Sequence, residues 1–383
     1  MSARLHVAIV HDYLTQLGGA ERVVLELTRA FPDAPVFTSL YAPDCTFPAF
    51  RDVDVRASAL DRSSFLRAHH RAAFPFLAPT FSAMHVDADV VVCSSSGWAH
   101  GVRTTGAKLV YCHAVARWLS QPGRYLGERV TGDRPSPTGR AAHAAARATL
   151  QLATPPLRAW DRRAARGANR YLANSEVTRR AVRDRYGIDA EIVPPPVTPL
   201  RADAEPVAGL DPGFVLCVSR LLPYKNVDVV TAAAARLPAE RFVVVGDGPE
   251  AQRLRADAPA NVTFRSGLSD GALRWCYEQC AALVAPSFED FGLTVLEANT
   301  AGRPVAALRA GGYLETVAAG ITGLYFDTPE AGPVARALGE VLARSWDPEA
   351  LRVHAGTFSP DRFHTRLRDE VAALADQPTG RAR

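Results

Sequence analysis

The stretch FVLCVSRLLPYKN, residues 214–226, decides the fold. Its first part is a continuous apolar run, and its second part is a loop that contains a proline. This order predicts a buried strand over 214–220, then a loop, then a helix from about residue 226. Lys225 lies in that loop, and it is one of only two lysines, with Lys108, among 44 basic residues.

The same alternation of apolar runs and amphipathic stretches extends along the chain on both sides of this loop. Further strands are predicted at 5–10, 35–40, 89–95, 108–113, 170–175, 190–197, 241–246, 261–267, 281–287 and 303–308. Helices are predicted at 20–31, from Ser175, from about residue 291, and from Pro360 with Ser359 as N-cap. Strands that alternate with helices indicate a parallel α/β architecture.

A domain boundary is expected at three consecutive prolines and the polar, turn-rich stretch 198–212 that follows them. The sequence therefore predicts two Rossmann-like, doubly wound parallel-sheet domains, 1–198 and 199–358. Residues 359–383 are expected to form a helix that packs back towards the N-terminal domain, followed by a disordered tail. The segment 131–146 is typical of a flexible loop that runs into a helix.

Composition favours a cytoplasmic globular protein with a large core. Of the 383 residues, 48% are apolar and 22% are charged. No apolar run reaches the roughly 18 residues of a membrane-spanning helix, and no signal-peptide cleavage pattern is seen. The six scattered cysteines indicate reduced, mostly buried thiols.

Positive charge is concentrated in one part of the chain. Residues 101–190 hold 17 Arg or Lys and 6 Asp or Glu, a difference of +11 in a chain whose net charge is +4. Such a region could face an anionic membrane surface or a phosphorylated substrate, or it could be a solvated arginine-rich surface. Aromatic residues do not interleave with the arginines, so nucleic acid is not favoured as a partner.

Four charged residues of the C-terminal half are candidates for a functional site. Arg220 and Lys225 follow a strand at the edge of the sheet where ligands bind, and two fixed cations there could neutralise a diphosphate leaving group. Glu289 and Glu297 flank the expected helix start near residue 291, and a helix N-terminus suits a phosphate or polar ligand. The alternatives are two surface cations and an ordinary helix with acidic residues at its start.

Glycine turns add weaker candidates. Gly246 and Gly248 in VGDGPE, and the pair 311–312 in RAGGYLE, would let the backbone approach a ligand closely, although plain tight turns fit as well. Gly18 and Gly19 stand between the first strand and its helix, where backbone amides could cradle a phosphate. No Walker lysine and no GxGxxG pattern is present, so neither a P-loop nor a standard dinucleotide site is supported.

Two further features end strands of the N-terminal half. His113 follows the strand 108–113, and it is either a site residue or a structural histidine. The serines 94–96 have no Gly-x-Ser-x-Gly elbow around them, which favours an ordinary loop.

Taken together, the motifs resemble a known family. SRLLPYKN, VGDGPE, FEDFGLTVLE and AGGYLE, in this order, are similar to motifs of the retaining glycosyltransferases of family 4, which have the GT-B fold. HDYLTQLGGAERVVLEL and YCHAVARWL resemble the N-terminal domain of that family, most closely its bacterial mannosyltransferases. Three positions depart from the pattern of the nearest relatives: residues 114–118 (AVARW), Asn226 and Tyr313.

The resemblance implies a role for each candidate in the C-terminal domain. Arg220 and Lys225 would hold the donor diphosphate as it leaves. Glu289 would lie beside the donor sugar hydroxyls, and Glu297 would accept hydrogen bonds from the nucleotide ribose. The remaining donor-binding positions are the backbone amides of Phe291, Gly292 and Leu293 and the turn formed by Gly246, Gly248 and Pro249.

In the N-terminal domain, the resemblance implies that Gly18 and Gly19 approach the phosphates or the acceptor and that His113 contacts the transferred sugar. It also implies an enzyme that needs no metal and no cofactor. The expected reaction moves a hexose, best guess mannose from GDP-mannose, to a hydroxyl of a glycan, lipid-linked or small-molecule acceptor. A GT-B sugar-nucleotide epimerase and a non-catalytic nucleotide-sugar-binding protein are the alternatives.

Overall fold

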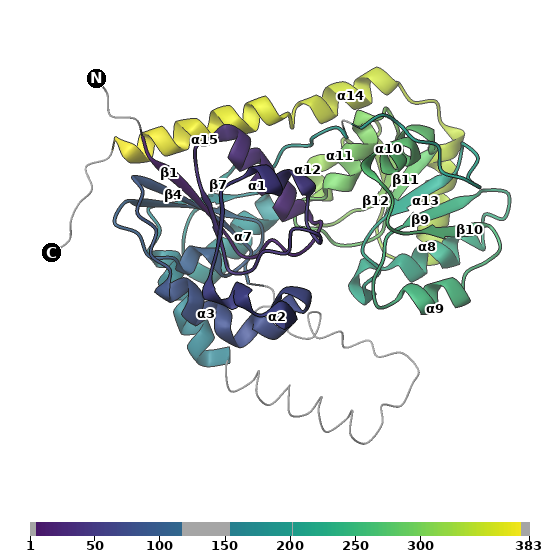
Figure 1. Ribbon diagram of the computed structural model, residues 1–383. Helices are drawn as coiled ribbons and strands as arrows, with labels where there is room; N and C mark the ends of the chain where they lie inside the picture. Colours follow the sequence, from purple (N-terminus) through teal and green to yellow (C-terminus); the bar gives the residue numbers. More distant parts are fainter. Residues whose placement is uncertain (1–4, 117–153, 201, 377–383) are drawn as a thin grey trace. The chain divides into compact units, whose positions relative to one another are not determined.

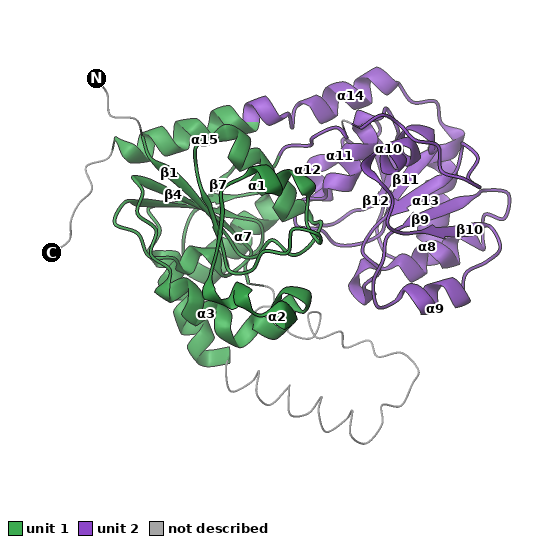
Figure 2. Cartoon of the chain, viewed as in Figure 1, with its two compact units in different colours: residues 1–195, 363–383 green, residues 196–362 purple. Residues whose placement is uncertain are grey.

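The computed structural model describes residues 5–116, 154–200 and 202–376, which form two compact units (Figures 1 and 2). Unit 1 comprises Met1–Pro195 and Phe363–Arg383, and unit 2 comprises Pro196–Arg362. The chain therefore leaves unit 1 within the three prolines and returns to it at the C-terminal helix. The predicted loop at 131–146 and the predicted disordered tail lie outside the described residues, the tail from residue 377 on.

Unit 1 is built on a seven-stranded parallel sheet in the order β3-β2-β1-β4-β5-β6-β7. The strands are β1 Val7–His11, β2 Val36–Thr38, β3 Val55–Ala57, β4 Val90–Ser95, β5 Ala107–Cys112, β6 Arg170–Ala173 and β7 Glu191–Ile192. The central strands β4 and β5 are buried along their whole length, as expected for continuous apolar runs covered on both faces. Strand β3 was not predicted, because it is only three residues long and two of them are exposed.

Helices cover both faces of this sheet. They are α1 Gly19–Ala30, α2 Ser64–Ala68, α3 Phe74–Ala83, the helical residues 154–166, α7 Glu176–Tyr186 and α15 Pro360–Ala375, with 3-10 turns at Pro48–Asp52, Ala59–Arg62, His70–Ala73 and Ala99–Gly101. Helix α15 buries Phe363, Leu367 and Val371, spaced four residues apart, in the same apolar cluster as strand β1. His364 Nε2 also lies 2.9 Å from Glu26 Oε2 of α1, so this helix is part of the unit 1 core.

Unit 2 contains a six-stranded parallel sheet in the order β10-β9-β8-β11-β12-β13. Its strands are β8 Val215–Val218, β9 Phe242–Val245, β10 Val262–Arg265, β11 Ala282–Ala285, β12 Val305–Leu308 and β13 Gly323–Phe326. Its helices are α8 Val227–Ala234, α9 Ala251–Ala256, α10 Asp270–Gln279, α11 Leu293–Thr300, α12 Tyr313–Thr316, α13 Ala331–Ala343 and α14 Pro348–Gly356, with a 3-10 turn at Pro223–Lys225. Strand β13 was not predicted, since it begins with a glycine and half of its residues are only partly buried.

Both sheets have the strand order of the doubly wound fold. In each unit the first and fourth strands are neighbours, β1 with β4 and β8 with β11, and the chain winds outward from this pair in both directions. The crevice beyond the carboxyl ends of such a pair is where open α/β sheets bind ligands. The loops after β1, β4, β8 and β11 are therefore the first places to look for a site. Among the described residues, no helix combines the length and the apolar character that a membrane crossing requires.

In unit 2, glycines let these loops pack backbone against backbone. A Cβ on Gly246, whose φ is +155°, would lie 1.8 Å from the Ser219 carbonyl oxygen. A Cβ on Gly311, at φ +66°, would lie 2.3 Å from the Glu289 carbonyl oxygen. The turn after β9 is thus fitted against the loop after β8, and the turn after β12 against the loop after β11.

Replacement of Gly246 by alanine should therefore destabilise unit 2 by about 3 kcal/mol, because the backbone conformation and the Ser219 carbonyl both exclude a methyl group. Gly339→Ala is the matched control. Gly339 lies inside α13 with nothing within 4 Å of its added Cβ, so alanine there should stabilise the helix by about 0.5–1 kcal/mol. Urea denaturation followed by circular dichroism measures both variants. Equal stability of the two would contradict the assigned contact.

Candidate functional site

Lys225 and Glu289 meet at the crevice of unit 2, the switch point where the chain winds outward from β8 and β11 in both directions. Lys225 ends the 3-10 turn after β8, and Glu289 lies in the loop after the neighbouring strand β11. The Lys225 Nζ atom is 2.5 Å from Glu289 Oε1, and the lysine is only 8% exposed. One partly buried ion pair therefore links the two loops that border the crevice.

Asn226 fixes the direction in which Lys225 points. Its φ of +54° makes it the single non-glycine residue with a left-handed backbone in the part of the chain that the structure describes. Its side-chain amide donates to the Pro286 carbonyl at 3.1 Å, which ties the β8 loop to the β11 loop a second time. Asparagine is one of the few side chains that tolerate this conformation, so Asn226 can form the turn without a glycine.

The Glu289 carboxylate is held by a second donor and borders a buried tyrosine. Ser287 Oγ donates to Glu289 Oε1 at 2.5 Å. Burial, and then the charge of Glu289, hold the pKa of the Tyr313 phenol well above its usual range. The Tyr313 ring packs over Gly292, whose φ is +94°, so that a Cβ on this glycine would be 2.5 Å from the ring. The large side chain at 313 thus positions the residue that precedes α11.

Helix α11 begins directly beside this carboxylate. Gly292 is its N-cap and makes no side-chain cap, Leu293 is its first residue, and Phe291 before it is buried. The first amides of the helix therefore have no side-chain acceptor from the cap residue, and they carry the positive end of the helix dipole. This end of α11 is suited to an anionic or hydroxyl-bearing ligand.

Glu297 lies farther along α11 and is positioned by a residue that the sequence did not indicate. The Tyr277 hydroxyl, from helix α10, donates to Glu297 Oε2 at 2.6 Å. Tyr277 is buried, and nothing in its own segment distinguishes it from a core aromatic residue. Only the fold brings it to the carboxylate.

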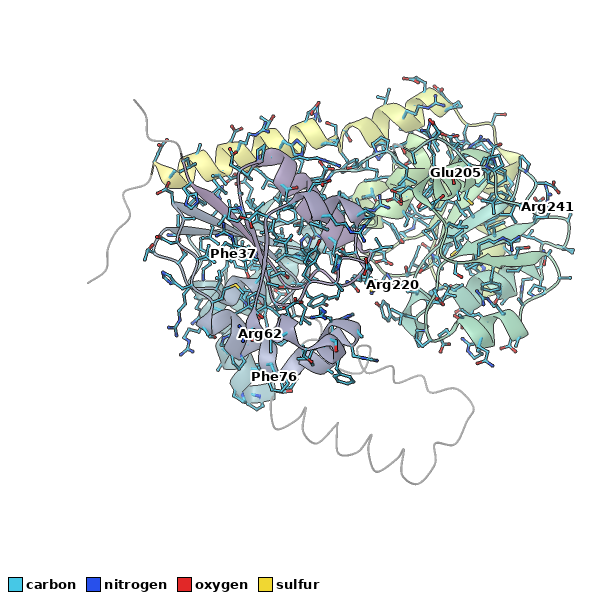
Figure 3. All side chains as sticks on the ribbon, viewed as in Figure 1. Phe37, Arg62, Phe76, Glu205, Arg220 and Arg241 are labelled. Atoms are coloured by element: carbon cyan, nitrogen blue, oxygen red, sulfur yellow. The ribbon has the colours of Figure 1, made fainter. Side chains whose placement is uncertain are left out.

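Arg220 is exposed (Figure 3). Its Nη2 lies 3.4 Å from the Tyr224 hydroxyl in the same loop. The glycine turn after β9 makes its close backbone approach within unit 2. Gly246 and Gly248 approach Ser219 and Leu221 of the chain itself, with the added Cβ of Gly248 at 2.4 Å from the Leu221 carbonyl. These glycines therefore shape the loop that carries Arg220, and the exposed Pro249 follows them just before α9.

The site candidates of unit 1 are His113, Gly18 and Gly19. His113 follows β5 and is 9% exposed, with its Nε2 2.7 Å from Ser94 Oγ. Burial, and then the neighbouring His11, lower the pKa of His113 from 6.5 to about 3, so its imidazole is neutral at ordinary pH. Gly18 is the N-cap of α1, and its added Cβ would be 2.3 Å from the carboxylate of the buried Glu21. The Glu21 carboxylate thus lies beside Gly18, at the position where the sequence predicted that backbone amides could bind a phosphate.

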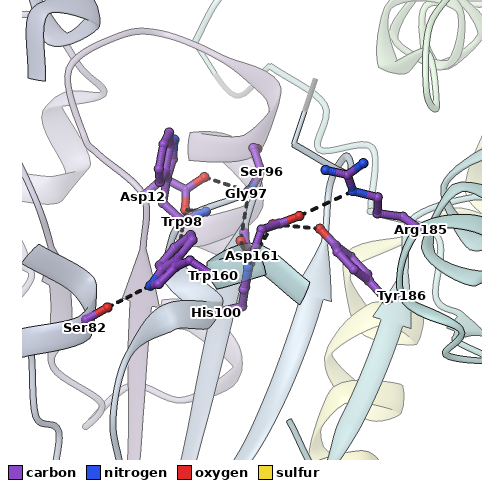
Figure 4. Close-up of polar contacts among 12 residues, drawn as sticks. Asp12, Ser82, Ser96, Gly97, Trp98, His100, Trp160, Asp161, Arg185 and Tyr186 are labelled. Carbon is purple, nitrogen blue, oxygen red and sulfur yellow. Dashed lines mark hydrogen bonds and ion pairs between the residues drawn. The ribbon is translucent and has the colours of Figure 1, made fainter. Parts of the chain in front are cut away.

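A buried carboxylate organises the crevice of unit 1, and the sequence did not reveal it. Asp12 follows β1 and accepts the backbone amides of Ser96 at 2.6 Å, Trp98 at 3.2 Å and Ala99 at 2.6 Å (Figure 4). Burial raises its pKa, against the lowering effect of His11 and of these amides. Ser94 and Ser95 are the last residues of β4, so the predicted loop begins only at Ser96, whose amide is held by Asp12. Ser94 is the serine that contacts His113.

Two family comparisons together match most of the chain. Residues 17–201 match Glycosyltransferase Family 4, and residues 202–355 match Glycosyl transferases group 1. The border between the two matches lies within a few residues of the division between the compact units.

Similar proteins are found among glycosyltransferases. The D-inositol 3-phosphate glycosyltransferase of Mycobacterium sp. (strain KMS) is 33% identical over 235 residues, which are 54% of this chain and 52% of that protein. The protein of the same name from Mycolicibacterium smegmatis is 33% identical over 233 residues, 54% of this chain and 53% of that protein. The matched region spans about half the length of these relatives.

Solved structures of similar fold cover nearly the whole chain. Sucrose-phosphate synthase from Thermosynechococcus elongatus superposes with a TM-score of 0.64 at 19% identity, over 97% of this chain and 99% of that one. Anabaena HepE in complex with UDP-glucose gives a TM-score of 0.65 at 16% identity, over 96% of this chain and 100% of that one. The chain therefore matches two glycosyltransferase domain families in succession, and its two units have the GT-B fold.

Proposed function

We propose that this protein is a metal-independent retaining glycosyltransferase that moves a hexose from a nucleoside diphosphate sugar to an acceptor hydroxyl. The observation that carries the proposal is the Lys225–Glu289 ion pair at the switch point of unit 2. It places a buried ammonium and a carboxylate where a doubly wound sheet binds its ligand, beside the uncapped start of α11.

The reaction requires cations at the leaving group rather than a protein nucleophile. The bond between C1 of the sugar and the diphosphate oxygen breaks, and its electron pair goes to the diphosphate. Lys225 and Arg220 stabilise this charge as it develops. The acceptor oxygen bonds to C1 on the same face, and its proton passes to the departing phosphate oxygen.

The neighbouring groups orient the donor. Glu289 accepts hydrogen bonds from sugar hydroxyls, and the amides at Phe291, Gly292 and Leu293 donate to the sugar or the phosphates. Glu297, oriented by Tyr277, accepts the ribose hydroxyls.

Unit 1 supplies His113, Gly18 and Gly19 to the sugar, phosphates or acceptor. Because the imidazole of His113 is neutral, it acts through hydrogen bonding to the sugar and adds no full charge. The Glu21 carboxylate beside Gly18 favours a hydroxyl of the acceptor over a second phosphate at this position.

The best candidate for the donor is GDP-mannose, and the acceptor is a glycan, a lipid-linked sugar or a small molecule. Other donors and acceptors belong in the same test. Relatives are named for D-inositol 3-phosphate, and a similar structure holds UDP-glucose.

The proposed activity is tested by incubating the full chain with GDP-mannose, UDP-glucose and ADP-glucose in EDTA, with a mixture of sugar and polyol acceptors. We expect one donor to raise the melting temperature and to release free nucleotide, with transfer unaffected by the chelator. Binding without release would indicate a binding protein instead, and an epimeric nucleotide sugar would indicate an epimerase. Loss of transfer in EDTA would contradict metal independence.

Lys225→Arg should lower kcat/KM about 100-fold while the fold is retained. The planar guanidinium is larger than the ammonium and does not fit the buried space against Glu289, although the charge is kept. Arg241→Lys, in the exposed pair with Asp211 of the same unit, is the control and should leave transfer unchanged. Full activity of Lys225→Arg would remove the lysine from the proposed site.

We further propose that the basic region 101–190 brings the protein to an anionic membrane surface, at the inner face of the plasma membrane. Co-sedimentation with phosphatidylserine-containing vesicles should be strong at low salt and weak at high salt, because exposed charges are screened. No binding at low salt would rule this partner out.

A further inference from the structure

A cavity of about 710 Å³ lies in unit 1, and none of the residues proposed for the transfer reaction lines it. It is bordered by the start of β5, by the residues just before β6, by the helix 154–166 and by the turn at 101–106. The strands are parallel, so their starting ends share one edge of the sheet, opposite the edge where His113 lies. Lys108 and His113 are five residues apart along an extended chain, which is roughly 17 Å.

The charged side chains that line this cavity are all basic. Arg103 and Arg163 are exposed at its borders, Lys108 is 8% exposed in its wall, and His85 adds an ionisable ring. Within the described ranges, neither arginine has a side-chain hydrogen bond or an ion pair. Two guanidinium groups are therefore available to a ligand.

Lys108 has no acidic partner in the described part of the chain. Its Nζ makes one hydrogen bond, at 3.0 Å to the His100 carbonyl, and so has two further donors to offer. Burial lowers the pKa of this ammonium from its usual value, against the raising effect of Cys93. The other lysine, Lys225, is equally buried but is paired with Glu289.

The acidic residues near the cavity-lining segments in the sequence already have other hydrogen-bond or ion-pair partners. Asp161 contacts Tyr186 at 3.0 Å, His100 at 3.3 Å and Arg185 at 3.6 Å. Asp89 accepts the His6 amide, and Asp87 accepts the Thr105 hydroxyl. A buried cation without a counter-charge is costly, so an anion that enters the cavity would relieve that cost.

An aromatic wall stands beside the cations. Trp160 lines the cavity, and its indole N–H donates to Ser82 Oγ at 2.7 Å, which fixes the plane of the ring (Figure 4). Gly101 leaves room for the ring, because a Cβ there would be 2.4 Å from it. A planar or sugar ring attached to an anion could pack on this fixed surface.

We propose that this cavity is a second ligand site, which binds a phosphate monoester with its phosphate on Lys108, Arg103 and Arg163 and its organic part on Trp160. The phosphate is carried by a soluble metabolite or by a lipid headgroup, since the recognition chemistry is the same. The site lies at the sheet edge opposite the proposed site residues of unit 1 and does not depend on the transfer reaction.

The test is calorimetric titration of the full chain with phenyl phosphate, in an Arg220→Ala background that weakens phosphate binding at the proposed donor site. The double variant Arg103→Ala/Arg163→Ala should bind about tenfold or more weakly, because two charge-assisted contacts are lost. Arg162→Ala removes an exposed arginine of the same helix that does not line the cavity, and it should leave the affinity unchanged. Equal affinity in the double variant and in this control would overturn the proposal.

Lys108→Met gives a second readout. Inorganic phosphate should raise the melting temperature of the wild type, and this rise should disappear in Lys108→Met. If that variant does not fold, the titrations of the arginine double variant still test the proposal.

Co-sedimentation with phosphatidylcholine vesicles, with and without phosphatidic acid, distinguishes a lipid headgroup from a soluble phosphate ester. If vesicle binding is lost in Arg103→Ala/Arg163→Ala, the ligand is a lipid headgroup. If only the binding of phenyl phosphate is weakened in this variant, the ligand is a soluble ester. Dependence in neither assay overturns the site.

Discussion

Every strand in both units runs parallel to its neighbours, and this constraint places the chemistry. A parallel strand must be followed by a crossover, so all the loops after the strands emerge at one edge of each sheet. The pair of strands from which the chain winds outward in both directions leaves a crevice between its loops. Asp12 with Ser96 in unit 1, and Lys225 with Glu289 in unit 2, lie at these two crevices.

The loops at the unit 2 crevice hold one another in place. Backbone contacts at Gly246 and Gly311 allow no side chain between the turns, and Asn226 bonds across to Pro286. The Lys225–Glu289 pair adds an interaction that a ligand can exchange. A buried ammonium needs an anionic partner, and Glu289 is that partner in this structure. The ion pair keeps the lysine side chain oriented between the two loops.

Much of this could be predicted from the sequence, for identifiable reasons. The continuous apolar runs mark β4, β5 and β8 because strands buried on both faces need no alternation, and the three prolines end the unit 1 sheet at β7. Strand β3 has only three residues and β13 has four that begin with glycine, so neither forms an apolar run long enough to be recognised. Tyr277 and Asp12 could not be predicted, because their partners lie 20 and more than 80 residues away. Gly246 was recognised as a point of close approach, but only the fold shows that its neighbour is Ser219.

The scarcity of lysine has a practical consequence. Each unit contains one lysine, Lys108 or Lys225, and each lysine is 8% exposed. All other Lys or Arg positions in the chain are arginine. Amine-directed reagents would therefore find almost no target on the folded surface apart from the α-amino group. Labelling at either lysine reports the opening of its own unit, so the two units carry built-in, chemically identical probes of their separate stabilities.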